Sequence, residues 1–88
     1  MERTVVKEKL DTFTEEFRAA LNLAVLMYPQ EYAYPLSEIP AIVERMRVAF
    51  DRGSYNYDSR AIRITCKVLG IKPTRKAIEA YLTTPKGV

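Results

Sequence analysis

The sequence predicts an all-α fold, a compact bundle of about four helices that forms a single domain over residues 1–88. Apolar residues recur at three- and four-residue spacing in four segments that proline or glycine separates, which is typical of amphipathic helices. No stretch alternates polar and apolar residues for long enough to indicate a strand. With 48% hydrophobic and 28% charged residues, the composition is that of an ordinary globular protein with one small core.

The first helix is expected over residues 13–28, where Pro29 ends it. Thr12 followed by Glu15 has the spacing of a capping box, in which the two side chains satisfy backbone N–H groups at a helix start. Leu10 continues the apolar spacing and favours an extension of this helix toward the N-terminus.

The second half of this helix has more apolar surface than a small bundle easily buries. Residues 19–30 contain no charge, and their apolar side chains cover most of the helix circumference. The surplus face is either a subunit interface, which predicts a homo-oligomer, or a surface in the middle of the bundle. Its residues are Leu23, Leu26 and Met27.

The second helix is expected to begin at Ser37 with Pro40 just inside it, and to stop at Gly53. Its apolar face predicts core packing and no ligand role. The face consists of Ile39, Ile42, Val43, Met46, Ala49 and Phe50.

The last two helices are predicted to form a helix-turn-helix-like pair. Asp58 or Ser59 caps the third helix, which runs to Leu69 with Gly70 in a left-handed stop position, and Thr74 caps the fourth. Their inward faces are Ala61, Ile62, Thr65, Cys66, Val68 and Leu69 in the third helix, and Ala77, Ile78, Tyr81 and Leu82 in the fourth.

Charge is unevenly distributed along the chain. Residues 1–50 hold six Lys/Arg and eight Asp/Glu, a net −2, whereas residues 51–88 hold eight and three, a net +5. A basic C-terminal half favours an anionic partner.

Several classes of function are disfavoured. The chain has no histidine and a single cysteine, Cys66, so we expect no disulfide, no metal and no cofactor. Without a histidine base or an activated nucleophile we also expect no enzyme activity. The longest apolar run, residues 23–28, is far shorter than the roughly 20 residues of a membrane span, and the acidic N-terminus does not resemble a signal peptide. We therefore expect a cytoplasmic protein without a membrane partner.

A nucleotide-type ligand is the leading expectation for the basic half. Cations in the first turn of a helix oppose its dipole, and a bound phosphate would reverse that cost. Tyrosine rings stack on bases while basic side chains hold phosphates. The predicted ligand-binding residues are Tyr32, Tyr34, Tyr55, Asn56 and Tyr57 in two loops, and Arg60, Arg63 and Lys67 within about 60° of one another on one helix face. The alternative interpretation is a solvated basic face with tyrosines packed on the bundle ends.

DNA binding is the second expectation, because residues 62–81 have the form of a helix-turn-helix. The turn with Pro73 is longer than the standard one. In this alternative Thr74, Arg75, Lys76 and Glu79 approach the groove, and the basic stripe of the third helix contacts the backbone.

Two segments carry a resemblance to a known family. From EYAYP at 31–35 through SYNYDSRAIRITCKVLGIKPTRKAIEAYL at 54–82, the chain resembles a family of small tailed-bacteriophage proteins without an assigned function. Where this chain has Pro73, Thr74 and Arg75, relatives have His-Thr-Tyr. The resemblance implies a phage accessory protein acting inside the host bacterial cell, and it implies no catalytic residue.

Together these patterns predict a non-enzymatic phage protein that sequesters a host immune signalling nucleotide and so acts against host defence. A protein-protein inhibitor of a defence factor that uses the surplus apolar face is a third expectation.

Overall fold

The computed structural model describes residues 4–55 and 57–84 and confirms the predicted all-α bundle. In chain order the elements are α1 (Lys7–Met27), the short 3-10 helix η1 (Leu36–Glu38), α2 (Ile39–Asp51), α3 (Ser59–Leu69) and α4 (Arg75–Thr83). The described residues contain no strand. None of their helices combines the length and the hydropathy that crossing a membrane requires.

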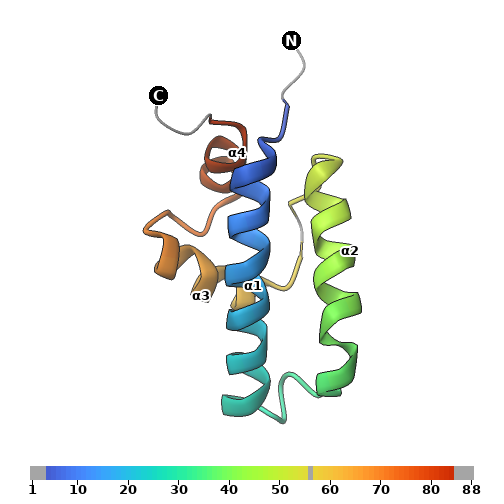
Figure 1. Ribbon diagram of the computed structural model, residues 1–88. Helices are drawn as coiled ribbons and strands as arrows, with labels where there is room; N and C mark the ends of the chain where they lie inside the picture. Colours follow the sequence, from blue (N-terminus) through green and yellow to red (C-terminus); the bar gives the residue numbers. More distant parts are fainter. Residues whose placement is uncertain (1–3, 56, 85–88) are drawn as a thin grey trace.

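The longest helix, α1, is the element on which the others pack. The second helix runs antiparallel along one side of it, α3 crosses the other side, and α4 lies beside its first turns (Figure 1). The Val6 N–H donates a hydrogen bond of 2.7 Å to the Leu82 carbonyl, which ties the start of α1 to the end of α4. The last two helices follow each other as predicted, but both pack on α1 and barely contact each other.

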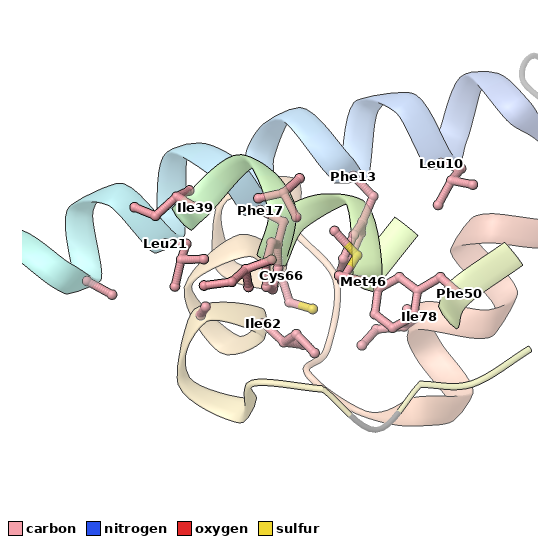
Figure 2. Close-up of a cluster of buried hydrophobic side chains, with 14 of the residues drawn as sticks. Leu10, Phe13, Phe17, Leu21, Ile39, Met46, Phe50, Ile62, Cys66 and Ile78 are labelled. Carbon is pink, nitrogen blue, oxygen red and sulfur yellow. The ribbon is translucent and has the colours of Figure 1, made fainter. Parts of the chain in front are cut away.

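The core lies where α2 and α3 meet α1 (Figure 2). The rings of Phe13 and Phe50 meet edge to face with centroids 5.3 Å apart. Because every apolar position predicted for α2 except Ala49 is fully buried, its apolar face is confirmed as core. The largest completely buried side chains are Phe13, Phe17, Leu21, Ile39, Val43, Met46, Phe50, Thr65, Cys66, Ile78 and Leu82.

The starts of the first two helices differ from the prediction. Val6 precedes α1 and no side chain caps it. The Thr12 hydroxyl lies inside the helix and donates to the Glu8 carbonyl at 3.0 Å, so the predicted capping box is wrong. Ser37 lies within η1, and α2 begins after Glu38 without a side-chain cap.

Local cap chemistry sets the bounds of α3 and α4 as predicted. The Asp58 carboxylate accepts a hydrogen bond of 3.0 Å from the Ala61 N–H, and Gly70 ends α3 with φ of 74° in the left-handed region that favours glycine. One inward position was predicted wrongly. Val68 is 63% exposed, because α3 is covered by α1 on one side only.

We expect Thr74→Ala to lower the free energy of unfolding by about 1 kcal/mol. The Thr74 hydroxyl accepts a hydrogen bond of 3.1 Å from the Ala77 N–H, and alanine leaves that donor at the start of α4 to water. Urea unfolding measures the change. Thr74→Ser keeps the cap and should stay within about 0.5 kcal/mol of the unmodified chain; an equal loss in both variants would contradict a capping role.

Candidate functional site

A row of three tyrosines and one arginine lies at the end of the bundle away from α4, where the loop after α1 meets the start of α3. The guanidinium carbon of Arg60 lies 5.1 Å from the centre of the Tyr28 ring and 5.5 Å from that of Tyr32. The rings of Tyr32 and Tyr34 are 6.4 Å apart. Arg60 is also ion-paired with Glu31. We call Tyr28, Arg60, Tyr32 and Tyr34 the aromatic row.

The members of the row differ in exposure. Tyr32 is buried, with 6% of its surface accessible, whereas Tyr28 and Tyr34 are each 39% exposed. Burial raises the pKa of Tyr32 to about 12, and the charge of Asp58 and a hydrogen bond with it add to the rise, while Arg63 opposes it. Tyr32 is thus a neutral structural ring at physiological pH, and the two outer rings are the accessible ones.

This pKa predicts an alkaline loss of stability. An unfolded tyrosine ionises near pH 10, whereas folded Tyr32 keeps its proton to about 12. Unfolding therefore releases a proton in this window, so rising pH favours the unfolded state, by at most about 2.7 kcal/mol for a shift of about two units. We expect Tyr32→Phe to remove this part of the decline when urea unfolding is followed from neutral pH to about pH 12. An unchanged slope in the variant would contradict the assignment.

A cavity of about 210 Å³ opens beside the row, between α1, α2 and the segment that leads into α3. The Tyr57 hydroxyl donates to the Ile42 carbonyl at 2.7 Å, and the Tyr57 ring meets Phe17 edge to face at 5.6 Å. Burial raises the pKa of Tyr57, and the positive charge of Arg45 opposes this rise. The cavity, hereafter the loop pocket, is lined by Leu21, Tyr34, Ile42, Arg45, Tyr57 and Asp58.

Arg45 and Asp58 line the pocket but were not among the predicted ligand-binding residues. Arg45 lies on the exposed side of α2, a helix that was predicted to have no ligand role. Nothing local marks it, because its place beside Tyr57 depends on how α2 packs against a segment twelve residues later in the chain.

The predicted ligand-binding residues are only partly brought together. Tyr32, Tyr34, Tyr57 and Arg60 lie in or beside the loop pocket, whereas Tyr55 stacks on Phe50 at 5.5 Å and lines a different hollow with Val5, Arg52 and Glu79. Arg63 and Lys67 are exposed further along α3. Asn56 lies outside the described residues.

The residues predicted for DNA binding surround the start of α4. Arg75 and Lys76 are exposed in its first turn, and Glu79 is half-buried. Thr74 serves as the helix cap, and the guanidinium carbon of Arg75 lies 5.9 Å from the centre of the Tyr55 ring. DNA binding stays a prediction that a gel shift at low ionic strength tests, since phosphate contacts weaken steeply with salt.

The loop pocket brings three kinds of side-chain group together. It combines an accessible ring, a guanidinium and a carboxylate, the groups that stack on a base, hold a phosphate and accept from a base N–H. Cys66 is fully buried in the core, which raises the pKa of its thiol. Among residues 4–55 and 57–84, no three His, Cys, Asp or Glu side chains are grouped so that they could hold a metal ion.

No protein-family model, no curated protein and no solved structure matches this chain.

Proposed function

We propose that this chain is a non-enzymatic binding protein for a nucleotide-type anion, and that it sequesters this ligand. The observation that carries the proposal is the loop pocket, where two tyrosines, Arg45 and Asp58 line one cavity of about 210 Å³. Stacking on an aromatic ring contributes about 1–3 kcal/mol per base. A charge-assisted hydrogen bond from a guanidinium to phosphate is among the strongest single polar contacts.

Each lining group has a role in this proposal. The Tyr34 ring, 39% exposed, stacks on the base, and Arg45 holds a phosphate at the pocket mouth. Asp58 accepts from the Ala61 N–H in the cap of α3 and is also hydrogen-bonded to Tyr32, and a remaining lone pair of its carboxylate accepts from the edge of the base. Tyr57 forms the floor, since its hydroxyl is already bonded to the Ile42 carbonyl.

The basic face of α3 extends the site outward. Arg60, Arg63 and Lys67 follow one another along this face, starting at the first turn of α3. A second phosphate of the ligand would neutralise Arg60, a first-turn cation that otherwise opposes the helix dipole. Arg60 must exchange Glu31 for that phosphate, so we assign phosphate contact first to Arg45.

Sequestration without chemistry fits the groups that line the pocket. The hydroxyl of Tyr57 has a raised pKa and is a poor base near neutral pH. Asp58 is held in place by the Ala61 N–H and by Tyr32, and among the described residues no serine, threonine or cysteine lines the pocket.

A phage origin completes the proposal. It rests on the resemblance of residues 31–35 and 54–82 to small tailed-bacteriophage proteins. The ligand would then be a host immune signalling nucleotide, held in the host cytoplasm so that a defence effector is not activated.

Native mass spectrometry of the chain purified from infected cells tests the proposal. We expect a nucleotide to co-purify and to be recovered chemically intact by chromatography after denaturation. A cleaved product would contradict binding without chemistry, and protein free of any small molecule throughout infection would contradict sequestration.

A further inference from the structure

Exposed apolar side chains are concentrated at one end of the molecule. Eight large hydrophobic residues are exposed in the described part of the chain, and six of them fall within residues 23–36. They follow the last turns of α1 and continue into the loop that lies beside its end (Figure 1). We call this set the apolar end: Leu23, Leu26, Met27, Tyr28, Tyr34 and Leu36.

We infer that the apolar end is the interface with a second copy of this chain, and that the second copy supplies the missing wall of the loop pocket. Exposed apolar patches of several hundred Å² mark interaction sites on small proteins. Leu26 is 68% exposed and Met27 59%, so these two most exposed side chains of the apolar end leave water only if another surface covers them.

The charge pattern favours a copy of the same chain as the occupant. A two-fold contact brings each patch against itself, so any charge near the axis faces a like charge. The exposed charged residues of α1 are Lys7, Glu8, Glu15 and Arg18, all in its first twelve residues, and no residue from 19 to 30 is charged. Two copies can therefore pack through the second half of α1 without repulsion.

The rim of the patch is self-complementary. Glu31 and Arg60 carry opposite charges and are paired, and Arg60 lies over the ring of Tyr28, a member of the apolar end. Across a two-fold axis, each of these charges can meet its opposite on the other copy. A partner with a charged surface would instead lose hydration against the neutral centre.

The size of the loop pocket supports the inference that a second copy supplies its missing wall. This part of the inference rests on the proposed function. Its volume of about 210 Å³ is below the roughly 300–1,000 Å³ of pockets that enclose a small ligand. Tyr34 belongs both to the pocket lining and to the apolar end, and Tyr32 and Arg60 connect it to Tyr28. A copy seated on the apolar end therefore comes against the pocket mouth.

Sedimentation equilibrium of the full chain tests the interface. We expect a dimer or larger assembly at micromolar concentration, and a monomer for Leu26→Glu. Val68→Glu is the matched control, because Val68 is 63% exposed on a helix and lies outside the apolar end. Circular dichroism confirms that both variants keep their helices. A monomeric unmodified chain, or an assembly that Leu26→Glu leaves intact, would overturn the inference.

A disulfide variant gives an independent measurement. The native Cys66 is fully buried, so Leu26→Cys introduces a single accessible thiol. We expect mild oxidation to link two copies nearly completely, and Val68→Cys to be linked no faster than random collision. Equal rates would overturn the inference.

Nucleotide titration separates the two proposals. If Leu26→Glu lowers the affinity for nucleotide at least tenfold, this supports the inference that the second copy completes the loop pocket. A dimer that binds no nucleotide would support the interface and contradict the proposed function. A monomer that binds nucleotide would support the proposed function and contradict the interface.

Discussion

Replacing Phe17 with alanine is expected to lower the free energy of unfolding by about 3–5 kcal/mol, a large part of the total stability of a domain this small. Phe17 is completely buried in the middle of α1, where α2 and α3 both pack. Its ring also meets Tyr57 at 5.6 Å. The truncation therefore opens a cavity that two other elements cannot fill by moving together.

Urea unfolding without ligand measures this loss. Val68→Ala is the control, because it truncates an apolar side chain that is 63% exposed. We expect the control to stay within about 0.5 kcal/mol of the unmodified chain. Equal losses in the two variants would contradict the position of Phe17 at the centre of the core.

Replacing Arg45 with glutamine is expected to weaken nucleotide binding about 10- to 100-fold, the effect of losing a hydrogen bond to a charged group. Among the residues that the structure describes, Arg45 is the one cation that lines the loop pocket. Because its side chain is exposed, the stability of the fold should change by less than about 0.5 kcal/mol.

Arg18→Gln is the matched control for Arg45→Gln. Arg18 is an exposed arginine on α1 and does not line the loop pocket. It removes the same charge from the whole molecule, so a general loss of positive potential would weaken binding equally in both variants. That result would contradict a specific phosphate contact at Arg45.

The sequence predicts the fold best where local backbone chemistry decides it. Asp58, Gly70 and Thr74 each act within a few residues of their own position, and the bounds of α3 and α4 follow from them. The start of α1 follows a different rule. Leu10 is buried, and α1 begins at Lys7, before Thr12. Burying Leu10 in a longer helix therefore stabilises the fold more than a side-chain cap at Thr12 would.

The arrangement of the site was predicted only in part. Tyrosines and arginines were expected to meet near the start of α3, and Arg60 does lie between Tyr28 and Tyr32. The burial of Tyr32 could not be predicted, since it depends on a turn in which the Tyr32 N–H bonds back to the Tyr28 carbonyl at 2.9 Å. That turn folds the ring against the bundle.

The division of the two tyrosines before α3 also depends on tertiary packing. Tyr55 and Tyr57 are two residues apart, yet one stacks on Phe50 and the other meets Phe17. The loop thus passes between two parts of the core, and its rings point to different hollows. Both tyrosines had been assigned to one ligand site.

Calorimetric titration of the full chain with cyclic dinucleotides and ADP-ribose derivatives tests whether the loop pocket binds a nucleotide through Arg45. We expect a binding heat at micromolar protein for at least one of these nucleotides, strongly reduced in Arg45→Gln and retained in Arg18→Gln. Absence of heat for every compound, with the chain folded as circular dichroism reports, would contradict it.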